Sequence, residues 1–233
     1  LKDDLFKIWV AEKRIQNKSE YYIIQHGGCI RLCKIDQEED HFIQSSDGFI
    51  SWGWQLSDKL IIDKLPSLQL DKKVIRSKKN GDILIILATY PRYFYIQYSV
   101  PISDDYLDYI NNIEEIYKVS YKLNNKKVKL RFDREVNGWD AERRLRKSLK
   151  VFKKDNNNLS LLKSLRKYKL AICTANSTVF LQTLCQNFPT LLFIDLRFYE
   201  IRDDVFEDFK NLNNNGICFF DKENLLKQLS KIN

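Results

Sequence analysis

The chain has 233 residues, of which 44% are apolar and 13% aromatic, and 39 basic residues outnumber 31 acidic ones to give a net charge of +8. This composition supports a proper core in one large domain or two small ones, and it excludes a chain that is disordered as a whole. The charge indicates affinity for anionic ligands or a membrane face. Nucleic acid is not an expected partner, because no nucleic-acid-binding motif accompanies the charge.

No segment of the sequence approaches 18 consecutive apolar residues, and no signal segment opens it. We therefore expect a soluble or peripheral protein, in the cytoplasm or at the inner face of the membrane. The chain begins at Leu1 and contains no methionine, so we expect a fragment whose upstream part is missing. Three of the five cysteines lie in elements expected to be buried, which predicts reduced core thiols at Cys173, Cys185 and Cys218.

The first elements are a helix over residues 2–16 and a strand over residues 21–25, which leads directly into His26-Gly27-Gly28. Two consecutive glycines allow the backbone to approach another group closely. His26 stands at this turn as a hydrogen-bond donor or proton-transfer group. A purely structural histidine is the alternative.

An acidic cluster follows in Glu38-Glu39-Asp40-His41, which contains the only other histidine. Its carboxylates are either chemical groups or part of a solvated face. A zinc site built from His26, His41 and a carboxylate is disfavoured, since no helical His-x3-His spacing supports it. We expect no metal.

A basic stretch over residues 72–79 indicates a crossover between domains, and the apolar run over residues 82–89 suits a central parallel strand buried on both faces. The following loop sets Arg92 among aromatic residues at the carboxyl edge of that strand, where an open sheet has its crevice. Arg131 lies near the carboxyl end of a further expected strand.

The segment that organises the chain is residues 169–195, which read as strand, tight turn, helix and strand. Asn176, Ser177 and Thr178 begin the helix at the carboxyl end of a strand, where free backbone N–H groups and the helix dipole favour an anion. A simple capping role for Asn176 and Ser177 is the alternative. The buried face of this helix is predicted to consist of Val179, Leu181, Leu184 and Cys185.

The remaining predictions complete an alternating α/β pattern. Strands are expected over residues 21–25, 49–51, 83–88, 128–132, 170–173, 190–193 and 217–219. Helices are expected over residues 103–120, with Ser103 as the cap, 140–153, 159–168, 201–212 and 222–232. The basic helix over residues 140–153 is expected to face water rather than a membrane. The sequence lacks GxxxxGK[ST], GxGxxG after a strand and GxSxG, which removes the main support for a kinase, a classical dehydrogenase or a hydrolase.

Several short motifs in chain order carry a resemblance to a known family. They are residues 22–28 with Gln25-His26-Gly27-Gly28, Glu39-Asp40-His41, residues 46–54 with Trp52-Gly53-Trp54, Asn176-Ser177-Thr178, and Pro189-Thr190. They resemble a family of bacterial transferases of surface-carbohydrate biosynthesis, which look like GT-B glycosyltransferases and are distantly similar to Kdo transferases and CDP-glycerol glycerophosphotransferases. Members often continue the first motif with a glycine and an aromatic residue, where this chain has Cys29-Ile30-Arg31.

The resemblance implies an α/β fold of GT-B type, with Rossmann-like, doubly wound parallel sheets. Members of the family are much longer, so the second domain is expected to be complete and the first partial. Residues 1–66 would end the first, acceptor-side domain. Residues 67–233 would form the second, which binds the nucleotide donor and ends in a helix.

The resemblance also implies a transferase that moves a sugar or polyol phosphate from a nucleotide-activated donor to a carbohydrate or lipid-linked acceptor, without a cofactor. The expected donor and phosphate ligands are Arg92, Arg131, Asn176, Ser177 and Thr178. The candidates for base or nucleophile are His26, Glu39, Asp40 and His41, and the loops of close approach contain Gly27, Gly28, Trp52 and Trp54. A nucleotide- or polyanion-binding module without chemistry is the alternative, and a dehydrogenase or epimerase lacks the dinucleotide fingerprint.

Overall fold

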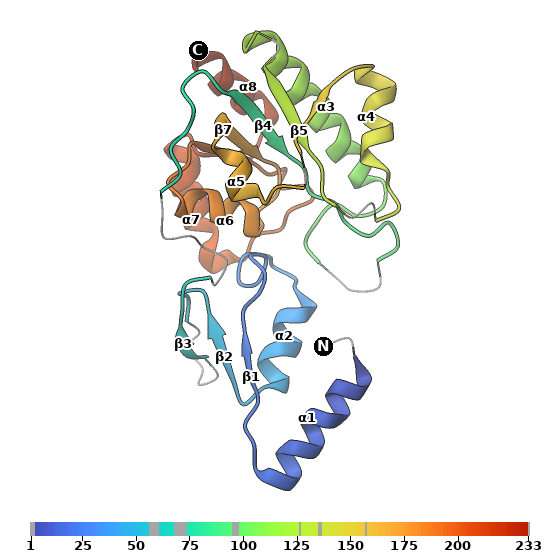
Figure 1. Ribbon diagram of the computed structural model, residues 1–233, viewed down its shortest axis with the longest axis vertical. Coiled ribbons are helices and arrows are strands. Elements are labelled where there is room, and N and C mark those ends of the chain that lie inside the picture. Colours follow the sequence, from blue (N-terminus) through green and yellow to red (C-terminus); the bar gives the residue numbers. More distant parts are fainter. Residues whose placement is uncertain are drawn as a thin grey trace.

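The structure is a computed structural model that describes residues 3–55, 61–67, 74–94, 98–125, 127–134, 137–156 and 158–232. Its strands form a three-stranded sheet and a six-stranded sheet, and every strand pairing within them is parallel (Figure 1). The predicted α/β class with parallel sheets is therefore confirmed. Residues 72 and 73 of the expected crossover lie outside the described residues.

The three-stranded sheet, here called the small sheet, has the order β1 (Tyr22–Ile24), β2 (Gly48–Ser51) and β3 (Ile61–Lys64). Helix α1 (Asp4–Asn17) precedes it, and helix α2 (Gln37–Ser45) connects β1 to β2. The strands over residues 21–25 and 49–51 and the first helix were predicted. Helix α2 and strand β3 were not.

Helix α2 covers the small sheet because its apolar residues recur on one side. Phe42 and Ile43 are buried together with Phe49 of β2 and Ile30. The Asp36 carboxylate caps the helix by accepting hydrogen bonds from the backbone N–H groups of Glu38 and Glu39. The acidic cluster is thus the first turn of a helix, where negative charge complements the helix dipole.

The six-stranded sheet, here called the large sheet, has the order β6-β5-β4-β7-β8-β9. Counted along the chain within this sheet, the order is 3-2-1-4-5-6, which is that of doubly wound Rossmann-like sheets. The predicted neighbours are confirmed, since Ile83 pairs in parallel with Leu170. The strands are β4 (Asp82–Ile86), β5 (Val128–Arg131), β6 (Lys153–Lys154), β7 (Tyr168–Cys173), β8 (Thr190–Phe193) and β9 (Cys218–Phe219).

Both faces of the large sheet are buried, because alternate residues of each strand belong to different cores. Ile83 and Ile85 pack in one core, and Leu84 and Ile86 in the other. Helices α3 (Asp105–Leu123), α4 (Ala141–Leu149) and α8 (Lys222–Lys231) contribute to the first core. Helices α5 (Leu161–Leu165), α6 (Thr178–Cys185) and α7 (Asp203–Asn214) contribute to the second. The strand order changes direction between β4 and β7, and a sheet of this kind has its crevice there, at the carboxyl ends of the two strands.

Several predicted boundaries were wrong. The basic helix expected over residues 140–153 ends at Leu149, because Lys153 and Lys154 pair with β5 as an edge strand. The helix expected over residues 159–168 has only five residues, since Tyr168 already begins β7. Ser103 is not the cap of α3, which follows Asp104.

The buried face predicted for α6 was right in part, since Val179, Leu181 and Leu184 are partly buried against the second core, but it missed the fully buried residues and wrongly included Cys185. Phe180 and Thr183, one helical turn apart, are its buried residues, so the exposed Cys185 lies on another side of the helix. Cys173 and Cys218 are buried as predicted, and Cys33 is a further buried thiol. Among the residues that the structure describes, every helix is too short or too polar to cross a bilayer.

Candidate functional site

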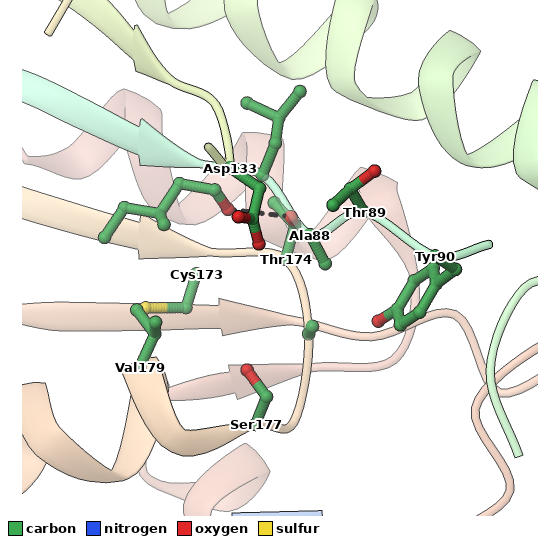
Figure 2. A pocket seen from close by; sticks show the side chains of 11 residues that line it. Ala88, Thr89, Tyr90, Asp133, Cys173, Thr174, Ser177 and Val179 are labelled. Carbon is green, nitrogen blue, oxygen red and sulfur yellow. Dashed lines mark hydrogen bonds between the residues drawn. The ribbon is translucent and has the colours of Figure 1, made fainter. Parts of the chain in front are cut away.

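A cavity of about 190 Å³ lies at the switch point of the large sheet (Figure 2). Its walls come from the carboxyl ends of three adjacent strands and the residues that follow them: residues 86–90 at the end of β4, five residues between positions 173 and 179 at the end of β7, and Asp133 after β5. The complete lining is Ile86, Leu87, Ala88, Thr89, Tyr90, Asp133, Cys173, Thr174, Ala175, Ser177 and Val179. Ligands of doubly wound sheets bind in this position.

A chain of hydrogen bonds fixes the backbone beneath this cavity. The N–H of Ala88 donates to the hydroxyl of Tyr109 at 2.8 Å, and the Tyr109 hydroxyl contacts Oγ1 of Thr174 at 2.7 Å. That oxygen donates to the carbonyl of Ile86 at 2.8 Å, which closes the chain between β4 and β7. The Thr174 hydroxyl is therefore occupied inside the protein and is not free for a ligand.

Further tyrosines support the same backbone. The hydroxyl of Tyr106 donates to the carbonyl of Ala88, and that of Tyr199 donates to the carbonyl of Thr174 at 3.0 Å. Burial raises the pKa of Tyr106 to about 12 and the pKa of Tyr199 well above its ordinary value, so both stay protonated donors. The sequence analysis missed these residues, because Tyr106 and Tyr109 read only as the apolar face of a helix.

Helix α6 begins at the edge of the cavity. Ser177 is its N-cap residue and lines the cavity, and its side chain makes no capping hydrogen bond, so the hydroxyl remains available at the helix N-terminus. Asn176 is buried and does not line the cavity, and its amide nitrogen has no hydrogen-bond partner within the described part of the chain. The Ser177 side chain therefore does not cap the helix, as the alternative interpretation of the sequence had it.

The glycine turn of the small sheet meets the same helix end. The backbone N–H of Gly28 donates to Oγ1 of Thr178 at 2.8 Å. A Cβ atom at position 28 would lie 2.5 Å from the backbone nitrogen of Thr178, whereas a Cβ at Gly27 would meet nothing within 4 Å. Only Gly28 is therefore required for close approach, and it brings the loop after β1 onto the start of α6.

Gln25 holds this turn to the tryptophan motif. Its side-chain amide donates to the carbonyl of Gly27 at 2.8 Å, and its oxygen accepts from the backbone N–H of Trp52 and from the indole N–H of Trp54, both at 2.8 Å. The two motifs are thus neighbours in space. A buried glutamine at the end of a strand gave no sequence signal for this linkage.

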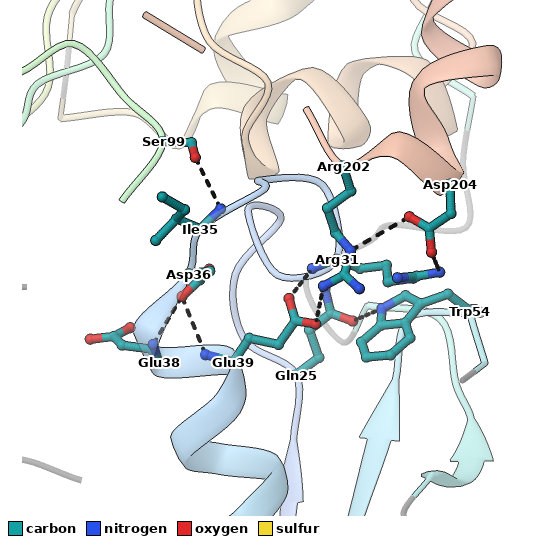
Figure 3. Close-up of polar contacts among 10 residues, drawn as sticks. All are labelled: Gln25, Arg31, Ile35, Asp36, Glu38, Glu39, Trp54, Ser99, Arg202 and Asp204. Carbon is teal, nitrogen blue, oxygen red and sulfur yellow. Dashed lines mark hydrogen bonds and ion pairs between the residues drawn. The ribbon is translucent and has the colours of Figure 1, made fainter. Parts of the chain in front are cut away.

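Glu39 connects the small sheet to the large one (Figure 3). Its buried carboxylate accepts a hydrogen bond of 2.6 Å from the backbone N–H of Arg31 and forms an ion pair of 3.0 Å with Arg202, which precedes α7. The guanidinium of Arg31 is itself paired with Asp204. The Glu39 carboxylate is committed to these contacts, while its catalytic assignment stays a prediction.

The other proposed proton-transfer groups are exposed. His26 contacts the ring of Phe42 edge-on, with ring centroids 5.7 Å apart, and makes no hydrogen bond to a described residue. Asp40 and His41 lie on the exposed side of α2. Among the described residues, no group of three or more His, Cys, Asp and Glu side chains is placed to hold a metal ion.

The two arginines predicted to bind phosphate differ in their surroundings. Arg92 is exposed, lies over the rings of Tyr93 and Trp139, and forms no ion pair with a described residue. The guanidinium of Arg131 is mostly buried, pairs with Asp155 and donates to the carbonyl of Leu159 at 2.8 Å. Their roles toward a ligand stay predictions.

Residues 1–233 match a family model described as LIC12162 family transferase. The chain belongs to this family. A comparison with curated proteins found no match. Membership of the LIC12162 family makes the chain part of a transferase family, and the cavity between β4 and β7 is its candidate site.

Proposed function

We propose that the chain is a GT-B-type glycosyltransferase-like enzyme, which moves a sugar or a polyol phosphate from a nucleotide-activated donor to a cell-surface carbohydrate or lipid-linked acceptor. The observation that carries the proposal is the meeting of two loops at the switch point. Ser177 and Thr178 begin α6 beside the cavity of the large sheet, and Gly28, in the loop after β1 of the small sheet, contacts that helix end. A donor in the cavity would thus lie close to residues of both sheets.

The donor phosphate is assigned to the N-terminus of α6. Backbone N–H groups and the helix dipole stabilise an anion there, and the Ser177 hydroxyl adds a hydrogen bond. The cavity of about 190 Å³ is smaller than the pockets of drug-sized ligands, so it holds the phosphate-proximal part of the donor rather than the whole molecule.

Charge at the departing phosphate is balanced without a metal ion in this proposal. The N-terminus of α6 supplies part of the positive charge. We assign the rest to Arg92, since its guanidinium has no ion pair with a described residue. The proposal does not depend on Arg131, whose guanidinium is bonded to Asp155.

Proton transfer from the acceptor is assigned to His26. The residue stands two positions before Gly28 and is exposed, and histidine is the side chain that most often acts as a general base. Asp40 and His41 are the other exposed candidates of this segment. Since the acceptor can be lipid-linked, the enzyme is expected to work at the inner face of the membrane.

The test is a calorimetric titration with CMP-, CDP-, UDP- and GDP-sugars and with NAD, followed by a turnover assay of every ligand that binds. Binding of one nucleotide class with release of the free nucleotide is expected. Binding without turnover under any acceptor condition would indicate a nucleotide-binding module. Binding of NAD alone would contradict the proposal and favour a dehydrogenase or epimerase.

A further inference from the structure

Two cysteines lie in one turn of the loop after β1, and neither lines the cavity at the switch point. The carbonyl of Cys29 accepts hydrogen bonds from the backbone N–H groups of Leu32 and Cys33, at 2.9 and 3.0 Å, and these bonds close the turn. The thiol of Cys33 donates a hydrogen bond to the sulfur of Cys29. The two sulfur atoms are therefore in contact in the folded chain, so only small side-chain movements are needed to join them.

The two thiols differ in their access to solvent. Cys33 is buried beneath the turn, whereas Cys29 is partly exposed. Cys29 is thus the sulfur that a small solute in water can reach, and Cys33 is the thiol that stands behind it.

Their contact also makes Cys29 the more acidic thiol of the two. The hydrogen bond from Cys33 stabilises the Cys29 thiolate and lowers the pKa of Cys29, against the opposing effects of burial and of the carboxylates of Asp36 and Glu38. The same hydrogen bond, together with burial, raises the pKa of Cys33 far above its ordinary value. Cysteines that sense oxidants share a low pKa, access to solvent and a neighbouring thiol that resolves the oxidised form. Cys29 has all three properties.

The turn is held to the large sheet on both of its sides. Cys33 forms an antiparallel bridge with Ile201, which precedes α7. Gly28, the residue before Cys29, donates its N–H to Oγ1 of Thr178 at 2.8 Å. A covalent link between the two sulfur atoms would therefore restrain the segment that lies between two contacts of the small sheet with the large one.

We propose that Cys29 and Cys33 are a redox-active pair, which a hydroperoxide oxidises to an intramolecular disulfide, and that this disulfide makes the contact between Gly28 and Thr178 more persistent. Neither sulfur belongs to the cavity in which the donor is placed. The inference therefore goes beyond the proposed function and does not depend on it.

The reaction has two steps, shown here for hydrogen peroxide. In the first, the thiolate sulfur of Cys29 attacks one peroxide oxygen, so that an S–O bond forms, the O–O bond breaks and the departing hydroxide takes up a proton as water. In the second, the sulfur of Cys33 attacks the sulfenic sulfur of Cys29, an S–S bond forms, and hydroxide leaves with the Cys33 proton as a second water. The two thiols lose two electrons, which reduce the peroxide. A thiol reductant reverses the change by exchange.

The experiment exposes the protein to hydrogen peroxide, blocks the remaining thiols with N-ethylmaleimide in denaturant, and maps every cysteine by mass spectrometry after digestion with trypsin. Trypsin cleaves after Arg31, so the disulfide is seen as the peptide that ends at Arg31 joined to Leu32-Cys33-Lys34. An untreated sample and a sample reduced with dithiothreitol before blocking are the controls. The exposed thiol of Cys185 is the internal reference.

We expect the joined peptides to appear with a loss of about 2 Da, for two hydrogen atoms, and to separate after dithiothreitol. Cys29 should be oxidised at least about 10-fold faster than Cys185, because the thiolate is the reactive form. Cys33→Ser should stop at the sulfenic acid of Cys29, which dimedone traps, and Cys29→Ser should leave Cys33 unoxidised. Cys185→Ser should form the disulfide as the wild type does.

The wild-type peptide map decides the outcome even where a variant fails to fold. If Cys29 and Cys33 are both still blocked by N-ethylmaleimide when Cys185 has been oxidised, the inference is overturned. A disulfide that joins other cysteines, or two chains, overturns it as well.

The effect on the two sheets is measured by hydrogen exchange of the Gly28 amide in the reduced and the oxidised protein. Exchange should be slower after oxidation, because the restrained turn opens less often and the N–H stays bonded to Thr178. Equal exchange in the two forms overturns the structural effect of the disulfide. None of these measurements uses a nucleotide, so their failure is distinct from failure of the proposed function.

Discussion

The backbone N–H of Gly28 donates a hydrogen bond of 2.8 Å to the hydroxyl of Thr178, although 150 positions separate the two residues in the chain. This bond joins the loop after β1 of the small sheet to the first turn of α6 in the large sheet. It is supported nearby by the ion pair between Glu39 and Arg202. The relative position of two candidate site segments thus depends on a contact that only glycine permits.

Replacing Gly28 by alanine should separate these segments. The added Cβ would lie 2.5 Å from the Thr178 nitrogen and 2.7 Å from its Cα, and backbone atoms cannot yield cheaply. We expect a loss of about 1–3 kcal/mol in the free energy of unfolding, measured by urea denaturation, and a loss of transfer activity. Gly27→Ala is the control, because a Cβ there meets nothing within 4 Å, and it should change stability by less than about 0.5 kcal/mol. Equal effects of the two substitutions would contradict the close approach.

Removing the Arg131 side chain should cost stability rather than ligand binding. Arg131→Met leaves the Asp155 carboxylate buried with hydrogen bonds from Ser164 and Tyr168 alone among the described residues, and breaking a buried pair costs about 3–5 kcal/mol. Adding Asp155→Asn should restore part of the loss in urea denaturation. A variant with wild-type stability and weakened nucleotide binding would instead support the phosphate role predicted from the sequence.

The contribution of Asp36 to the stability of the protein should decrease as the pH rises from about 4 to about 6. Burial raises the pKa of this carboxyl to about 6, against the opposing hydrogen bonds from the N–H groups of Glu39 and Glu38. The folded state therefore binds a proton that the unfolded chain has already lost, so the stability that Asp36 contributes is lost as the pH rises through this window and does not change further above it.

Asp36→Asn keeps a capping side chain and removes this titration. Its stability relative to the wild type, from urea denaturation at pH 4.5 to 7.5, should increase with pH up to about pH 6. Asp40→Asn, at an exposed position of the same helix, controls for the change in net charge. A constant difference between Asp36→Asn and wild type across this range is the outcome that contradicts the assignment.

Replacing His26 should affect transfer much more than stability. The ring is exposed, contacts Phe42 and has no hydrogen bond to a described residue, so His26→Gln should shift unfolding by at most about 1 kcal/mol. As a general base it should contribute about 10²- to 10⁴-fold in single-turnover transfer. His41→Gln tests the other exposed histidine of this segment, which also lies beside Phe42 with ring centroids 6.2 Å apart, and a larger loss of transfer in this variant would move the assignment to His41. Wild-type turnover in His26→Gln would end the catalytic role.

Local patterns predicted most of the large sheet. The apolar run after Gly81 and the segment around Leu170 read as buried parallel strands, and they are adjacent in the structure. Lys153 and Lys154 could not be predicted as a strand, since a charged pair becomes an edge strand only through its neighbour β5. The boundary near Tyr168 failed for the same reason, because pairing with β4 overrides the helical pattern.

The parts of the candidate site that lie within one short motif could be predicted from the sequence. The parts formed by residues far apart in the chain could not. Ser177 and Thr178 were placed at a helix N-terminus from their capping preference alone. The tyrosines beneath the cavity and Gln25 escaped detection, because their hydrogen bonds join segments far apart in the sequence. Asp133 was missed because no local motif distinguishes it, and only the strand order brings it to the cavity.

The most direct measurement is the calorimetric dissociation constant of the tightest-binding nucleotide for the wild-type protein, Ser177→Ala and Ser160→Ala. Ser160 precedes α5, is exposed and makes no side-chain capping bond, so it matches Ser177 in chemistry but not in position. With the donor phosphate at α6, Ser177→Ala should weaken binding by about 1–3 kcal/mol, or about 5- to 150-fold, with unchanged melting temperature, and Ser160→Ala should bind as the wild type does. Equal affinity of all three proteins would contradict the placement of the donor phosphate at the start of α6.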